Sequence, residues 1–268
     1  MPTHQPIPSL ASSEASIGRE SALHFDLLWR DLMKSLGSVE NEQFFRIITG
    51  EAHPLGNLAI LREPSDTRIV NEAVAPLLEL SKPSAVLFVA GVSDMVSEAL
   101  AALGFGKVSP MPAMAVDTAS VAPTKLPEGY EFLRVSSLEE GTAWVDVVAA
   151  GFELPRGLAR LLSPEVQGLS TEPDATVQFF GIRSKGKLVA ASLLYLANGL
   201  AGIYCVATLP EERGQGLGAH VTAEALRVAN RLGYGVGVLQ ASAAGHSVYL
   251  RLGFGDVESI PMFIRMPS

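Results

Sequence analysis

The hydrophobic and polar positions in the first half of the chain alternate between a helical period and a strand period. Apolar residues three and four positions apart predict helices, whereas short apolar runs bounded by turn residues predict strands. The expected order is helix 24–36, strands 44–50 and 57–61, helix 66–80, strand 85–90, helix 94–103 and strand 107–116.

The second half gives a similar order. It begins with a strand at 130–135 and a helix that carries Trp144 and Val148 on its apolar face. Lys185-Gly186 and Asn198-Gly199 predict tight turns between neighbouring strands. The remaining expected elements are strands 177–183, 187–197 and 200–207, helix 217–232, strand 235–240, helix 245–252 and strand 257–265.

Two polar segments suggest domain boundaries. Residues 1–22 are rich in Ser, Ala, Pro and Glu and lack the basic start and apolar run of a signal peptide, so a flexible tail is expected. Residues 118–128 hold two prolines and show no periodicity, which indicates a linker. The expected domains are therefore 23–117 and 129–268.

The two halves end alike. An offset of 149 residues places the ten positions from Leu103 to Pro112 on those from Leu252 to Pro261, and six of the ten are identical. Composition alone gives about one identity in such a window. The sequence therefore predicts two diverged copies of one unit. The alternative is that Leu-Gly-Phe only marks a common helix ending, with Gly in the left-handed position.

Composition narrows the class of protein. The 268 residues are 48% hydrophobic and 18% charged, which is typical of a soluble globular chain. The net charge of −8 makes nucleic acid an unexpected partner, and no apolar run reaches the roughly 20 residues of a membrane helix. Cys205 is the single cysteine and the five histidines lack metal-binding spacing, so we expect no disulfide, no metal and a cytoplasmic location.

The clearest chemical signal is the run Arg213-Gly214-Gln215-Gly216-Leu217-Gly218, which joins an apolar strand to an apolar helix. Glycines let the backbone approach an anion closely, and the first N–H groups of a helix point outward without partners. The helix dipole adds partial positive charge at the same place. The loop therefore predicts a pyrophosphate site, with Arg213 as a charged donor.

The same loop also contains the Gly-x-Gly-x-x-Ala pattern of dinucleotide-binding proteins. That pattern requires an acidic residue about 20 positions later to hold a ribose. No Asp or Glu lies between Glu224 and Asp256, so the dinucleotide interpretation is disfavoured.

The spacing Arg-x-x-Gly-x-Gly after residues 206–210, together with Tyr-Leu-Arg-Leu-Gly-Phe at 249–254, resembles motifs A and B of the GCN5-related N-acetyltransferases (GNAT). The resemblance covers about residues 130–265. It implies an α+β fold in which a mixed, mostly antiparallel sheet is flanked by helices. With the repeat, it implies two tandem copies, of which the first is degenerate.

The resemblance also implies a site for acetyl-CoA as co-substrate, without a metal. The pyrophosphate is expected on the backbone N–H groups of residues 215–219, and the pantetheine arm beside residues 204–207 as an added strand. The Val206 N–H is expected to polarise the thioester carbonyl, and Tyr249 to protonate the leaving thiolate. The expected catalytic residues are Tyr249 and Val206, and the expected cofactor-binding residues are Val206, Thr208, Arg213, Gly214, Gln215, Gly216, Leu217, Gly218, Ala219 and Ser242.

Two features depart from the family pattern. Ser242 stands where Asn is common. Strand 200–207 has no carboxylate to act as a base, which leaves Glu153, Tyr204 and water as alternatives.

The first half lacks the residues of the proposed site. The offset places the glycine loop on residues 64–69, which contain no glycine, and Tyr249 on Leu100. That half is therefore expected not to bind CoA but to shape the acceptor entrance.

The favoured function is an N-acetyltransferase that acts on a primary amine of a small molecule or peptide. Two alternatives stay open: a non-catalytic acyl-CoA-binding regulatory module, and a transferase for a longer acyl chain. A deep apolar cleft between Tyr204 and Tyr249 favours the latter. The sequence identifies neither the acceptor nor the oligomeric state, although a homodimer is compatible with it.

Overall fold

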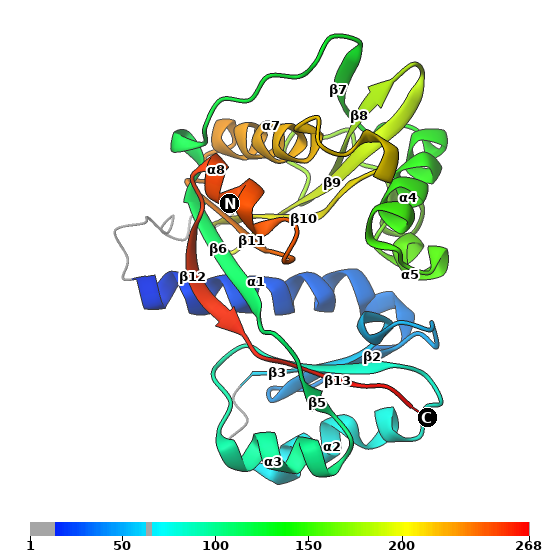
Figure 1. Cartoon of the computed structure of the whole chain (residues 1–268), viewed down its shortest axis with the longest axis vertical. Helices are drawn as coiled ribbons and strands as arrows, with labels where there is room; N and C mark the ends of the chain where they lie inside the picture. The colour runs from blue at the N-terminus through cyan, green and yellow to red at the C-terminus, as the bar shows by residue number, and fades with distance from the viewer. Residues whose placement is uncertain (1–13, 63–65, 268) are drawn as a thin grey trace.

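The computed structural model describes residues 14–62 and 66–267 as two β-sheets with one helix between them (Figure 1). That helix, α1 (Glu14–Met33), contacts strands of both sheets. In the described part of the chain the sheets have six and seven strands. Both are mixed and mostly antiparallel, and helices flank both, which confirms the predicted fold class.

The first sheet has the strand order β1-β2-β3-β4-β13-β5. Its outer face is covered by α2 (Thr67–Leu78) and α3 (Asp94–Ala102), and its inner face packs on α1. Its strands are β1 (Val39–Glu40), β2 (Phe44–Ile48), β3 (Asn57–Leu61), β4 (Ser84–Phe88), β5 (Gly106–Lys107) and β13 (Met262–Arg265).

The second sheet has the strand order β12-β6-β11-β10-β9-β8-β7. Helix α7 (Leu217–Arg231) and the short α8 (His246–Leu252) pack on one face, while α4 (Leu138–Phe152) and α1 pack on the other. The segments α5 (Arg156–Leu161) and α6 (Pro164–Gln167) follow α4. The strands are β6 (Met111–Asp117), β7 (Tyr130–Arg134), β8 (Val177–Ser184), β9 (Lys187–Ala197), β10 (Leu200–Thr208), β11 (Val236–Gln240) and β12 (Gly255–Ile260).

The two halves exchange strands. The sequence predicts one strand over 107–116, but the chain leaves the first sheet after β5 and enters the second sheet as β6. Likewise the strand expected over 257–265 is divided at Pro261 into β12 in the second sheet and β13 in the first. Proline has no N–H for a ladder, which fits a crossing point at Pro261. The two crossing segments pass each other beside α1 (Figure 1).

Strand order supports the internal repeat. In each half, two antiparallel strands, a helix and a parallel strand follow one another: β2-β3-α2-β4 in the first half and β9-β10-α7-β11 in the second. The parallel pairs β3–β4 and β10–β11 occupy equivalent places. In each sheet the next position is filled by a strand from the other half, β13 or β6.

Helix α1 begins earlier than expected. The tail predicted for residues 1–22 is wrong from Glu14 onward, because the helix runs from Glu14 to Met33; residues 1–13 lie outside the described part. The buried residues Ile17, Ser21 and Ala22 lie on this first part of α1. Ser, Gly and Ala gave no apolar periodicity in the sequence, yet small side chains suit a helix held between two sheets. One hydrophobic core joins α1 to strands of both sheets, so the halves share their interior.

Candidate functional site

The strands β10 and β11 separate in the middle of the second sheet. They are paired in parallel at Leu200, Ala201 and Gly202, and Gly202 faces Val238 in the last pair. Beyond that point β10 continues only against β9, and β11 only against β6. The edges of the two strands from Ile203 and Leu239 onward therefore form an opening with unpaired backbone groups, which a polar extended ligand is able to satisfy.

A β-bulge lies on the β10 side of this opening. Tyr204 faces Leu193 of β9 and Ala207 faces Ala191, so Cys205 and Val206 together oppose a single residue. Cys205 has a positive φ of 52°, which re-aims the backbone locally. Val206 is consequently outside the register with β9 as well as that with β11. The backbone of Val206, which the sequence predicts as the donor to a thioester carbonyl, is thus outside both strand pairings.

The glycine loop follows β10 after a short 3-10 turn at Pro210–Glu212 and leads into α7. Gly214 and Gly216 have φ of 80° and 78°, and Gly216 is the N-cap of the helix. Left-handed φ costs other L-residues about 1–2 kcal/mol, so glycine suits both positions. Residues 213–216 are exposed and Ala219 lies in the first turn of α7. The loop thus presents backbone N–H groups and the positive end of a 15-residue helix to solvent.

Side chains around the loop are tied to one another. The Arg213 guanidinium donates to the carbonyl oxygen of Gly151, at 2.9 Å, and so connects the loop to the end of α4. The Glu212 carboxylate accepts from the Tyr130 hydroxyl at 2.6 Å and from the Gln215 amide at 2.7 Å. This contact with Glu212 is the main cause that raises the pKa of Tyr130. Arg213 therefore has a structural contact in addition to the anion contact predicted from sequence.

Tyr249 lies on α8 and is 8% exposed. Its ring packs edge-on against Phe254, with the centroids 5.8 Å apart, and belongs to the core beneath α7. Burial raises the pKa of Tyr249, so the phenol keeps its proton at neutral pH. No hydrogen bond to its hydroxyl occurs among the described residues. A protonated, unengaged hydroxyl matches the state that a general acid has before it acts.

The other predicted residues fall around the same opening. Thr208 is the last residue of β10, and a Cβ on Gly151 would lie 2.8 Å from the Ala207 Cβ, so the end of α4 packs directly on this strand end. Ser242 follows β11, and its hydroxyl accepts from the N–H of Gly245 at 3.1 Å, at the start of α8. The structure thus gathers the predicted residues on β10, α7 and α8 around one edge of the sheet.

The two bases suggested by the sequence differ in environment. Glu153 is exposed at the left-handed C-cap of α4, with φ 56°. Tyr204 is buried, and burial raises its pKa well above the usual range, so its phenolate is not available at neutral pH. Tyr204 instead makes a hydrogen bond of 2.8 Å with Nδ1 of His24 on α1. Sequence reasoning missed His24, because its only signal was one polar residue on an otherwise apolar helix face.

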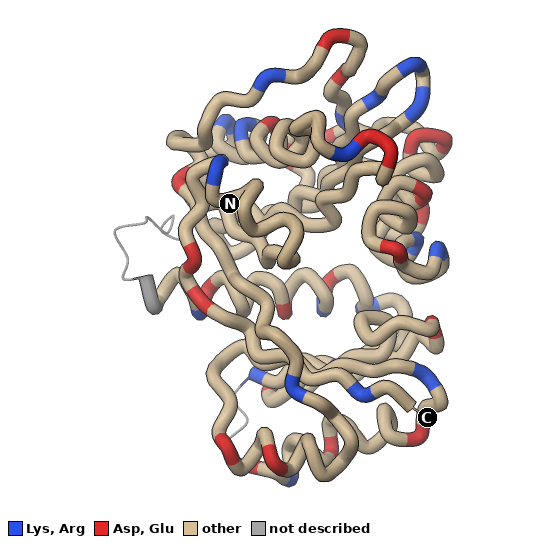
Figure 2. The backbone as a smooth tube through the Cα atoms, in the orientation of Figure 1, with Lys and Arg blue, Asp and Glu red and all other residues tan. Residues whose placement is uncertain are grey.

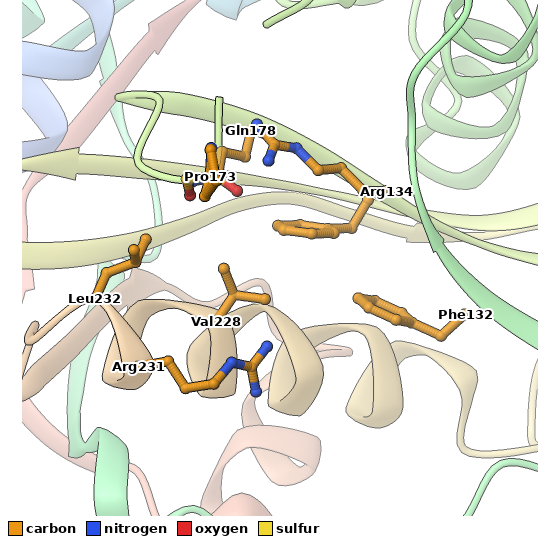
Figure 3. A pocket seen from close by; sticks show the side chains of 8 residues that line it. Phe132, Arg134, Pro173, Gln178, Val228, Arg231 and Leu232 are labelled. Carbon is orange, nitrogen blue, oxygen red and sulfur yellow. The ribbon is translucent and has the colours of Figure 1, made fainter. Parts of the chain in front are cut away.

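Two cavities lie away from the opening. One, of about 290 Å³, is at the C-terminal end of α7, between Arg231 on that helix and Phe132 and Arg134 on β7 (Figure 3). The other, of about 240 Å³, lies between the halves and is lined in part by Glu51 and Leu161. Neither is lined by Tyr204 or Tyr249, so neither supplies the cleft that a long acyl chain would occupy.

The equivalent place in the first sheet is closed. Strands β3 and β4 are paired without a register shift from Leu58–Ala85 to Leu61–Phe88. The N-terminus of α2 holds a carboxylate, since Asp66 accepts from the N–H of Arg68 at 2.8 Å; residues 63–65 of the predicted loop equivalent lie outside the described part. Leu100, at the position equivalent to Tyr249, is fully buried. A negative cap in place of glycines disfavours an anion there.

Three further observations concern charge, metal ligands and membrane-spanning helices. Acidic and basic residues are mixed over both halves in Figure 2. Within residues 14–62 and 66–267 there is no cluster of three or more His, Cys, Asp or Glu able to hold a metal ion. Over the same residues, none of the helices has the length and apolar character needed to cross a membrane.

Comparison with known proteins gives a family match within the second half and a fold likeness over the whole chain. Residues 152–254 match the Acetyltransferase (GNAT) family. The chain resembles the GCN5-related N-acetyltransferase from Kribbella flavida, with a TM-score of 0.66 and 21% identity over 94% of this chain and 95% of that one. It also resembles a GCN5-related N-acetyltransferase from Sphaerobacter thermophilus, with a TM-score of 0.61 and 15% identity over 96% and 93%. No curated protein matches the chain.

These findings place a family domain in the second half and show the fold of the whole chain. The C-terminal half contains a GNAT acetyltransferase family domain, over residues 152–254. The two sheets and the nearly complete overlap with the Kribbella structure are consistent with a tandem GNAT-like arrangement. Members of this family typically transfer an acyl group from acetyl-CoA to an amine.

Proposed function

We propose that the second half of the chain, residues 129–268, is a catalytic N-acetyltransferase domain that transfers an acetyl group from acetyl-CoA to a primary amine of a small molecule or peptide. The observation that carries the proposal is the opening between β10 and β11, which has Val206 on one edge and the glycine loop at its end. The first half is a degenerate copy whose equivalent strands stay paired.

In this proposal the loop and the strand edge divide the binding of acetyl-CoA. The backbone N–H groups of residues 215–219 hold the pyrophosphate, assisted by Arg213. The edge of β10 from Tyr204 to Ala207 pairs with the pantetheine arm, and Thr208 and Ser242 flank it. The Val206 N–H, which the bulge leaves out of the register with β9, donates to the thioester oxygen in this proposal. These residues fit the co-substrate, because exposed backbone donors at a helix start meet its phosphates and an unpaired strand edge meets its amides.

The chemical step is a direct attack. The amine, after losing a proton to solvent or to Glu153, forms a C–N bond with the thioester carbon, and the Val206 N–H stabilises the developing oxyanion. The C–S bond then breaks, and Tyr249 gives its proton to the sulfur. The acetylated nitrogen loses its surplus proton to water, and Tyr249 is reprotonated from solvent. No carboxylate on β10 takes part, since the strand has none.

Thiol release from acetyl-CoA with a panel of amines tests this function. We expect turnover by the wild-type protein and a fall in kcat of about 100-fold in Tyr249→Phe, with unchanged CoA affinity, because a general acid contributes about that much. The control is Tyr195→Phe, which changes another buried tyrosine that hydrogen-bonds to Asp31. CoA binding without release for any amine would instead favour the non-catalytic module. Faster release from longer acyl-CoA thioesters would favour the long-chain transferase.

A further inference from the structure

Helix α1 makes hydrogen bonds to one side chain on each of the two separating strands, β10 and β11. On β10, Tyr204 meets Nδ1 of His24 at 2.8 Å. On β11, the Gln240 amide nitrogen donates to the hydroxyl of Ser21 at 3.2 Å and to its carbonyl at 3.4 Å. Ser21 and His24 are three residues apart and therefore lie on one face of α1, one helical turn apart.

Tyr204 and Gln240 lie on the same face of the sheet, beside the start of the opening. The last β10–β11 pair is Gly202–Val238, and each of the two residues lies two positions beyond it on its own strand. Side chains two positions apart along a strand share a face. Since Val238 packs with Ile17 of α1, Gln240 faces α1 as well, as does Tyr204.

The polar atoms at this place are incompletely satisfied. The Gln240 side-chain oxygen is buried without a hydrogen-bond partner, and so is Nε2 of His24, whose side chain is 1% exposed. A buried polar atom without a partner is energetically unfavourable, so native proteins keep few of them, often at functional sites. The second sheet thus has an unfilled acceptor beside the proposed acetyl-transfer site.

The protonation states make the Tyr204 oxygen a second acceptor. Burial lowers the pKa of His24 to about 4, with an opposing contribution from the Leu200 backbone, so the ring is neutral at pH 7. Tyr204 keeps its proton, and its hydrogen-bond partner among the described residues is His24. We assign the phenol as the donor to Nδ1, which places the histidine proton on Nε2. The lone pairs of the Tyr204 oxygen then stay free to accept.

We propose that the Tyr204 and Gln240 side-chain oxygens bind the two N–H groups of the attacking primary amine, and that His24 and Ser21 of α1 are positioning residues for this pair. The inference rests on the proposed acetyltransferase function. A neutral primary amine has two N–H donors and one lone pair; two fixed acceptors on the two strands leave the lone pair free for the thioester held at Val206. A site of this kind selects primary amines over their N-methyl derivatives, which have one donor fewer.

Steady-state kinetics with the amine panel, supplied as pairs of a primary amine and its N-methyl derivative, test the inference. We expect Tyr204→Phe and Gln240→Leu each to raise KM for the primary amine and to lower kcat/KM about 10- to 100-fold, and to reduce the preference over the N-methyl derivative. The affinity for CoA should not change. Gln178→Leu is the control, since Gln178 is a buried glutamine on β8 whose side-chain oxygen likewise has no partner.

Positioning by α1 needs a separate readout. His24→Leu removes the acceptor of the Tyr204 proton, whereas His24→Asn retains an oxygen near the position of Nδ1. We expect the amine KM to rise in His24→Leu and to be largely restored in His24→Asn. A ¹⁵N NMR spectrum of the wild-type ring should show a neutral imidazole protonated at Nε2 at pH 7; protonation at Nδ1 would contradict the assignment without any need for turnover.

The possible failures are distinguishable. If the wild-type protein releases no thiol with any amine, the proposed function fails, and this inference falls with it. If the wild-type protein is active while Tyr204→Phe and Gln240→Leu keep its KM and its preference for primary amines, only this inference is overturned. Thermal unfolding and CoA binding of each variant separate a loss of fold from a loss of amine binding.

Discussion

Gly202 of β10 pairs with Val238 of β11, and beyond this pair the two strands separate. The His24 and Tyr204 rings lie directly over Gly202, stacked with an interplanar angle of 8°. In the first sheet the equivalent strands stay paired from Leu58 to Leu61, with no gap between them. One glycine thus marks both the start of the proposed site and the place where α1 approaches the sheet.

Replacement of Gly202 by alanine should destabilise the protein. The added Cβ would lie 2.3 Å from Tyr204 Cε2 and 2.5 Å from His24 Cε1, and overpacking of this kind costs about 1–3 kcal/mol. Thermal unfolding should show a Tm lowered by about 2–4 °C per kcal/mol. The control is Gly255→Ala in β12, where no atom lies within 4 Å of the added Cβ. Equal Tm values for the two variants would contradict the tight approach of α1.

Stability should depend on pH through His24. Its pKa is about 4 in the folded protein and 6.5 ordinarily, so between these values the unfolded chain binds a proton that the folded chain does not. Stability therefore falls as the pH falls from 6.5 toward 4, by about 2–3 kcal/mol at pH 4.5. Urea unfolding at pH 7 and pH 4.5 measures this loss. The part due to His24 should be absent in His24→Asn, and an equal loss in both proteins would rule it out.

The pH profile of kcat should show no decline near pH 10 caused by deprotonation of Tyr249. Burial raises its pKa above the usual value near 10, so the phenol keeps its proton as the pH rises through 10. The ratio of wild-type kcat to that of Tyr249→Phe should therefore be constant from pH 7 to pH 10. A ratio that declines with a midpoint below pH 10 would show that the acid is a different group or that Tyr249 is less buried during turnover.

Gly216→Val should weaken CoA binding more than it weakens the fold. Its φ of 78° is unfavourable for valine, and the side chain would stand where backbone N–H groups meet a phosphate. Calorimetry should show an affinity for CoA at least tenfold lower. Gly233→Val is a matched control, because Gly233 has φ 89° just beyond the other end of α7. A similar loss of affinity in both variants would indicate general strain in α7 instead of a phosphate contact.

The exchanged strands should hold a cut chain together. Glu128 and Gly129 are exposed between the halves, so a protease site inserted there should be cleavable in the folded protein. Because β6 lies in the second sheet and β13 in the first, the two pieces should co-elute in size-exclusion chromatography and separate only in denaturant. Separation under native conditions would contradict the exchange. As a reference, the uncut protein with the same insertion should elute at the same volume.

The sequence by itself determined the local structure and the class of protein. Strands β3 and β9 have the predicted bounds, and Lys185-Gly186 and Asn198-Gly199 form the predicted turns, with positive φ at all four residues. Alternating apolar residues and glycine-containing turns act within a few residues, so they are readable along the chain. The loop at 213–218 and Tyr249 likewise rest on short spacings, and both lie inside residues 152–254, which match the GNAT family.

Only the tertiary structure decided which strands pair, and therefore what surrounds the proposed site. Alternation shows that a segment is a strand but not which sheet receives it, so the divisions at Pro261 and between Lys107 and Met111 were not readable. The first part of α1, residues 14–23, was equally hidden, since its small and polar residues become buried only because two sheets close over it. His24 and Tyr204 are 180 residues apart in the chain, and their contact depends on that closure.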